Sequence, residues 1–154
     1  MIQFSWTPLA RDVLKFNVDG STRGAPRAAG MRGVLWTSSG RVMCLFSKHL
    51  GHRESNTAGI MVIHKATDIV ATNPVFQGRK IIIGSDSKVV VSWVNNNSFE
   101  SINNVKLIYD IRNNLTKLGN MEVIYNARAT NSFADILAKR GSNMEGDLFV
   151  CGDL

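Results

Sequence analysis

The chain has 154 residues, of which 44% are hydrophobic and 19% charged, and its formal net charge is +6. This length fits one domain with a sizeable core. No apolar run reaches the length of a membrane span, and the first residues lack the apolar stretch of a signal peptide. Cys44 and Cys151 form neither a disulfide framework nor a zinc-ligand spacing. We therefore expect an intracellular chain without membrane contact, in the nucleus or the cytoplasm.

The positive charge is concentrated in the first third of the chain. Residues 1–53 hold eight basic and two acidic side chains, whereas the remainder holds ten of each. This asymmetry favours an anionic partner, most commonly nucleic acid. A solvated basic face without a partner is the alternative.

Residues 14–21, LKFNVDGS, predict a strand with two different faces. Leu14, Phe16 and Val18 fall on an apolar face, and the polar residues between them fall on the other face, which ends at Asp19. A carboxylate at the end of a polar face is well placed to bind a metal. Asp-Gly is also a common turn signal, so Asp19 as a turn former is the alternative.

The rest of the chain alternates between strand and helix patterns. Residues 29–37 and 41–48 predict two further strands joined by a tight turn, which makes an antiparallel meander with the first. The later elements are a helix from Ser55 or Asn56 to 72, a buried strand at 79–85, a helix from Asp86 to 95, a helix at 103–118 closed by Gly119, a strand at 121–126 and a helix from Asn131 or Ser132 to 140.

This order of elements predicts an α/β fold, a mixed sheet with helices on its faces. We expect an N-terminal segment at residues 1–13, one domain at 14–141 and a loosely attached tail at 142–154, where little periodicity is visible. His64 lies within the first helix without a second ligand on its face, so we do not expect it to bind metal.

Three aspartates stand at junctions between predicted elements: Asp19, Asp86 and Asp135. If the first and fourth strands are neighbours, Asp19 and Asp86 lie at adjacent strand ends. Clustered carboxylates repel one another unless a divalent cation neutralises them. Helix capping is the alternative, because Asp86 begins a helix and Asp135 follows Ser132 at the spacing of a capping box.

The stretches KFNVDGS, SDSKVVVSWVNN and ATNSFADILAKRG resemble the plant branch of ribonuclease H-like domains, of the kind found in reverse-transcriptase-like and retroelement-derived proteins. The resemblance runs from about Trp6 to Gly141. It implies a ribonuclease H-like fold with a five-stranded mixed sheet, the first three strands antiparallel, flanked by helices. It also implies endonucleolytic hydrolysis of the RNA strand in RNA-DNA hybrids.

In this family four carboxylates, in the order Asp, Glu, Asp, Asp, hold two Mg²⁺ or Mn²⁺ ions. Asp19, Asp86 and Asp135 match the first, third and fourth, which implies that they are catalytic and metal-binding residues. The resemblance further implies that nucleic acid passes Gly20, Ser21 and Asn56, and that Asn131 helps to set Asp135.

The second carboxylate is missing, because Gly59 stands where the family has Glu. The resemblance implies that this position faces the polar side of the sheet with room for a Glu. Glu54 lies five residues earlier in the preceding loop and is a poor substitute. Tyr125 and Ala129 replace a His and an acidic residue that are common in the family. We therefore expect metal to bind weakly.

Three functions remain open. One is a metal-dependent ribonuclease H, impaired at Gly59. Another is a catalytically inactive domain of the same fold that binds an RNA-DNA hybrid or duplex RNA. The third is a scaffold that contacts another protein. We expect a monomer or a domain of a larger protein.

Overall fold

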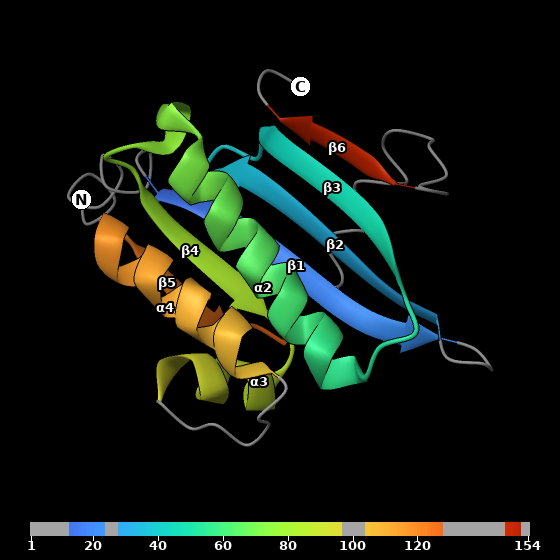
Figure 1. The fold of residues 1–154 in the computed structure, drawn as a ribbon. Coiled ribbons are helices and arrows are strands. Elements are labelled where there is room, and N and C mark those ends of the chain that lie inside the picture. The colour runs from blue at the N-terminus through green and yellow to red at the C-terminus, as the bar shows by residue number, and fades with distance from the viewer. Residues whose placement is uncertain (1–12, 24–27, 97–103, 128–146, 152–154) are drawn as a thin grey trace.

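The computed structural model describes residues 13–23, 28–96, 104–127 and 147–151. These ranges form a mixed β-sheet with α-helices packed on it (Figure 1), which confirms the predicted fold class. The strands are β1 (Val13–Arg23), β2 (Ala28–Thr37), β3 (Val42–Gly51), β4 (Lys80–Ser85), β5 (Met121–Tyr125) and β6 (Leu148–Cys151); the helices are α2 (Ser55–Thr72), the short 3-10 helix η1 (Pro74–Phe76), α3 (Lys88–Asn95) and α4 (Val105–Leu118).

The sheet is built around β1. Its strand order is β5-β4-β1-β2-β3-β6. β1 pairs antiparallel with β2 and parallel with β4, and β2 pairs antiparallel with β3. The predicted meander of the first three strands is confirmed. The described sheet has six strands, one more than the five that the resemblance implied.

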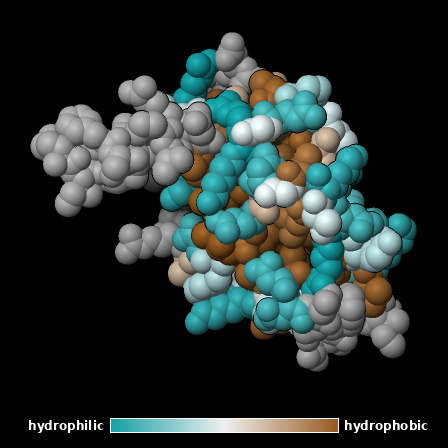
Figure 2. Space-filling view, turned by 90° about the vertical axis from the view of Figure 1, so that its left-hand side faces the viewer, coloured by the Kyte–Doolittle hydropathy of each residue, from teal (hydrophilic) through white to brown (hydrophobic). Residues whose placement is uncertain are grey.

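The apolar face of β1 forms the centre of the core. Leu14, Phe16 and Val18 are fully buried, and the Phe16 ring meets the Phe46 ring of β3 edge to face, with 5.9 Å between centroids. Figure 1 shows α2 lying across the sheet with α4 beside it. The side of the molecule in Figure 2 has apolar residues in its middle and hydrophilic residues around them.

A very close approach of backbones fixes α2 on β1. A Cβ atom on Gly20 would lie 2.1 Å from the carbonyl oxygen of Ala58 and 2.6 Å from the amide nitrogen of Gly59. No side chain fits between the strand and the first turns of the helix. Gly20 therefore allows the beginning of α2 to pack directly against the strand end that carries Asp19.

The helix caps differ from those predicted at two of three positions. Glu54 is the N-cap of α2 and makes no side-chain cap bond, so neither Ser55 nor Asn56 caps this helix. Ser87, and not Asp86, caps α3, because its hydroxyl accepts the Val90 N–H at 3.2 Å. Gly119 ends α4 in the left-handed conformation, as predicted.

The predicted tail contributes a strand to the sheet. β6 pairs antiparallel with β3, from Ser47 opposite Leu148 to Cys44 opposite Cys151. The pairing satisfies backbone groups that β3 would otherwise present at an edge. Four residues are too few for a strand pattern to be recognised in the sequence. The predicted last helix, with Asn131, Ser132 and Asp135, lies outside the described residues.

No helix in the described ranges combines the length and apolar character needed to cross a membrane.

Gly20→Ala should destabilise the protein strongly, because its methyl group would overlap the Ala58 carbonyl and force α2 away from β1. We expect the free energy of unfolding in urea to fall by about 2 kcal/mol or more. Gly30→Ala is the matched control in β2, since its Cβ would have its nearest neighbour, the Lys48 carbonyl oxygen, at 3.6 Å. Equal stability losses in the two variants would contradict this account of the helix position.

Candidate active site at the ends of β1 and β4

Asp19 and Asp86 lie at neighbouring strand ends. In the parallel pair of β1 and β4, Val18 is opposite Ser85, and each aspartate is the next residue of its chain segment. The Asp19 side chain is only 7% exposed, whereas Asp86 is exposed. Partial burial, and then the negative charge of Asp19, raise the pKa of Asp86. The two carboxylates therefore share one electrostatic environment, although their role as metal ligands stays a prediction.

A short turn between β4 and α3 holds Asp86. The hydroxyl of Ser85 accepts the backbone N–H of Ser87 at 3.2 Å, and Ser87 in turn caps α3. Because Ser85 is buried, this turn is anchored in the sheet. The position of Asp86 is thus set by its two serine neighbours, and its own carboxylate makes no cap bond.

The partner of Asp19 is Arg32, one of the basic residues concentrated in the first third of the chain. A terminal nitrogen of Arg32 donates to Asp19 Oδ2 at 2.7 Å. Arg32 stands directly opposite Asp19 in the pairing of β1 with β2, so the two side chains project from the same face of the sheet. Side chains alternate along a strand, and Gly20 faces α2, so this pair lies on the face away from α2. Arg32 gives Asp19 the positive charge that a metal would otherwise supply.

The position of the missing carboxylate is crowded. Gly59 is buried in α2, and a Cβ atom there would lie 3.1 Å from Cγ2 of Val90 in α3. Such a contact requires Val90 to move by a few tenths of an ångström. The space for a Glu side chain at this position is therefore smaller than the family resemblance implied. Glu54 is exposed at the N-cap of α2.

The implied nucleic-acid residues occupy different surroundings. Gly20 is packed beneath α2, Ser21 follows it in β1, and Asn56 is exposed in the first turn of α2. Tyr125 ends β5 with an exposed ring, and the Lys88 ammonium lies 5.0 Å from its centroid. Asn131, Asp135 and Ala129 lie outside the described residues.

The described residues do not fit a two-metal centre. Within the described ranges, no three His, Cys, Asp or Glu side chains are grouped so that they could hold a metal ion. Arg32 already neutralises Asp19, and Gly59 brings no oxygen ligand.

Asp86→Asn should stabilise the protein at neutral pH. With its pKa raised in the folded state, Asp86 contributes stability below its unfolded-state pKa and loses that contribution as the pH rises through the raised value. The neutral Asn side chain does not ionise, so the variant does not lose stability as the pH rises. Calorimetric scans should show a higher Tm for the variant at pH 7 and equal values once the pH is below the unfolded-state pKa of Asp86. Asp68→Asn, at an exposed position on α2, is the control. A parent protein that is more stable than Asp86→Asn at pH 7 would contradict the electrostatic coupling of Asp86 to Asp19.

Solved structures of ribonucleases H share this fold. The chain is similar to LC11-RNase H1, isolated from compost by a metagenomic approach, with a TM-score of 0.70 at 19% identity over 85% of this chain and 99% of that one. RNase H1 from the halophilic archaeon Halobacterium salinarum gives 0.67 at 22% identity over 84% and 99%. The N-terminal RNase H domain of a Mycobacterium tuberculosis protein gives 0.69 at 22% identity over 81% and 95%.

The search of the curated proteins found no match. The scan against family models matched the model described as reverse transcriptase-like over residues 17–141. That range begins in β1, two residues before Asp19, and extends through the end of β5. It covers most of the chain and agrees with the ribonuclease H-like fold of the described residues. The chain belongs to the reverse transcriptase-like family.

Proposed function

We propose that this protein is a nucleic-acid-binding domain of the ribonuclease H fold in which metal-dependent cleavage of RNA-DNA hybrids is impaired. The ion pair between Asp19 and Arg32 carries the proposal, because it occupies the carboxylate that the family resemblance assigns to metal. The glycine at position 59 by itself removes one of the four carboxylate ligands that the family resemblance implies. Together, the two features weaken both the donor set and the negative charge of the site.

Electrostatics supports the loss of metal affinity. A divalent cation at Asp19 has to displace the Arg32 guanidinium or lie next to it, and like charges repel. At 2.7 Å, with Asp19 buried and Arg32 half-buried, the pair is a charge-assisted hydrogen bond that a weakly bound ion does not break easily. Gly59 offers no oxygen to compensate for this cost.

The distribution of basic residues supports nucleic acid as the partner. Lys48 and Arg53 are exposed near the same end of the sheet as Asp19 and Arg32. Lys48 lies opposite Met31, the partner of Gly20, so it projects from the α2 side of the sheet. Their charges suit a phosphate backbone, whose recognition does not depend on base sequence. LC11-RNase H1, which has the same fold, has been solved in complex with an RNA/DNA hybrid. We infer the same class of ligand for this chain and a plant or retroelement origin for this branch of the family.

One observation favours a residual ribonuclease H as the second candidate. Asp19 and Asp86 remain adjacent, and the pKa of Asp86 is raised by burial and by the charge of Asp19. A cation would relieve this repulsion. If Asp135 completes the set, Mg²⁺ or Mn²⁺ would bind weakly, and hydrolysis of the RNA strand would be slow.

We expect binding to an RNA-DNA hybrid to be independent of sequence and to weaken steeply with salt. Each phosphate contact contributes about −0.9 to the log-log salt slope on duplex DNA. In fluorescence anisotropy, Lys48→Gln combined with Arg53→Gln should make the slope less negative by about one to two. Arg41→Gln is the matched control, because Arg41 lies at the opposite end of the sheet. Binding that is flat between low and physiological salt would contradict nucleic acid as the partner.

Repair of the metal site should require two changes. We expect Gly59→Glu combined with Arg32→Ala to cleave a labelled hybrid in Mg²⁺ or Mn²⁺ at least ten-fold faster than either single variant, because the pair of changes restores a ligand and removes the competing cation. Millimolar Mg²⁺ should raise the Tm of the double variant and leave that of the parent unchanged.

Controls for this repair separate the two proposed causes. Glu54→Ala should change neither cleavage nor the metal effect on Tm. Cleavage by Gly59→Glu alone that equals the double variant would show that Arg32 does not compete with metal. A parent protein that already cleaves at the rate of the double variant would favour the residual ribonuclease H.

A further inference from the structure

The strand pairing at the sheet edge brings the two cysteines of the chain together. Cys44 in β3 is directly opposite Cys151 in β6, although they are far apart in the sequence. Directly opposed residues of antiparallel strands have Cα atoms roughly 4.5 to 5.5 Å apart. This separation lies inside the range that a disulfide spans. Side chains of directly opposed residues project from the same face of the sheet, so the two free thiols lie next to each other.

We propose that Cys44 and Cys151 form a reversible disulfide that ties β6 to β3 when a small disulfide oxidant, such as oxidised glutathione, is available. Two cysteines are too few for a framework of structural disulfides, and a single reversible bond between them is compatible with that prediction. In a reducing compartment the pair stays as two thiols, and it closes when the supply of oxidant rises.

Burial assigns different roles to the two sulfur atoms. Cys44 is fully buried, and burial together with its neighbour Cys151 raises the pKa of its thiol. Cys151 is half-buried, and its Sγ accepts a hydrogen bond from Nδ2 of Asn73 at 3.7 Å. The thiolate is the attacking species in exchange, so the more accessible Cys151 reacts first.

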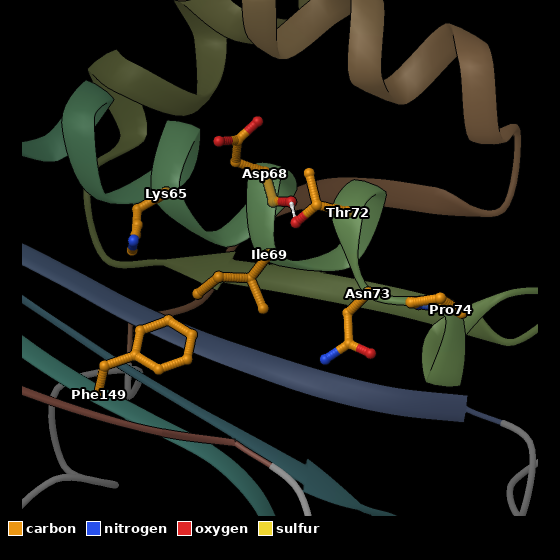
Figure 3. A pocket seen from close by; sticks show the side chains of 7 residues that line it. All are labelled: Lys65, Asp68, Ile69, Thr72, Asn73, Pro74 and Phe149. Atoms are coloured by element: carbon orange, nitrogen blue, oxygen red, sulfur yellow. Dashed lines mark hydrogen bonds between the residues drawn. The ribbon is translucent and has the colours of Figure 1, made fainter.

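Asn73 is held in the orientation that this bond requires. Its Oδ1 accepts the backbone N–H of Val75 at 3.2 Å and caps η1, which leaves the amide nitrogen for Cys151. Figure 3 shows the Asn73 amide extending from the end of α2 toward the strands, beside the hollow that Phe149 lines. The amide N–H thus lies against the sulfur that attacks in the first step of exchange.

The exchange balances in two steps. The Cys151 thiolate attacks one sulfur of oxidised glutathione, which forms a mixed disulfide and releases one glutathione thiol. The Cys44 sulfur, after losing its proton, then attacks Sγ of Cys151 and releases the second glutathione thiol. The protein loses two hydrogens and two electrons, and the oxidant is reduced to two thiols.

The bond would reinforce a strand with few attachments. Outside its pairing with β3, the described contacts of this segment include three side chains. Asp147 accepts the His49 N–H at 2.9 Å, the Phe149 ring lies 5.0 Å from the Lys65 ammonium, and Cys151 accepts from Asn73 and packs against the core. Phe149 is 52% exposed. A strand with little buried area separates from its sheet at a low free-energy cost. A covalent link from Cys151 to the core residue Cys44 should therefore suppress the separation of β6 more than that of the other strands.

The test treats the folded protein with oxidised glutathione at neutral pH, followed by alkylation, intact mass and a non-reducing peptide map. We expect the parent to lose two hydrogens, to yield a linked Cys44–Cys151 peptide pair and to return to thiols with dithiothreitol. The Tm should rise by roughly 5 to 15 °C. Amide exchange should slow in β6 and not in β5.

Variants assign the order of the steps. Cys44→Ala should stop at one glutathione on Cys151, and Cys151→Ala should stay unmodified. Asn73→Asp, which keeps the η1 cap and loses the N–H donor, should slow the first step several-fold. A parent that keeps a stable glutathione adduct, forms only intermolecular dimers or reacts only after unfolding in urea would overturn the proposal, and these outcomes do not depend on how the variants fold.

Discussion

The structure depends on the contact between the backbone of Gly20 in β1 and that of Ala58 in α2. This contact presses the first turns of the helix onto the strand end that carries Asp19. It also places Gly59 against Val90 of α3 and brings α2 over the buried Phe16. A side chain on the strand at this point would separate the helix from the sheet, and the candidate site would lose its shape before any ligand was considered.

Two carboxylates at one sheet end are accommodated in different ways. Asp19 is buried and shares a hydrogen-bonded ion pair with Arg32, whereas Asp86 remains in contact with water and has a raised pKa. The fold is shared with solved ribonucleases H, while a basic side chain of the protein itself neutralises one of the two carboxylates. Folds support several functions, and the side chains at the site distinguish between them.

The sequence predicts most of the described sheet and the neighbourhood of Asp19 and Asp86, because strand alternation and element order are strong signals. It does not reveal the partner of Asp19. The pairing with Arg32 depends on the register of β1 against β2, and the sequence pattern alone does not fix that register. The caps at Glu54 and Ser87 were missed because neighbouring polar residues compete for the same position. β6 is too short to show a period.

The central place of β1 has a consequence for the order of folding. Its antiparallel partner β2 begins five residues after β1 ends. Its parallel partner β4 pairs through contacts such as Val13 with Lys80, and β2, β3 and α2 lie between these residues in the sequence. Loop closure makes such distant pairing slow, so the hairpin is favoured to form first. Arg32 therefore reaches Asp19 within the hairpin before β4 delivers Asp86. In a newly made chain, the buried carboxylate is neutralised before its neighbouring like charge arrives.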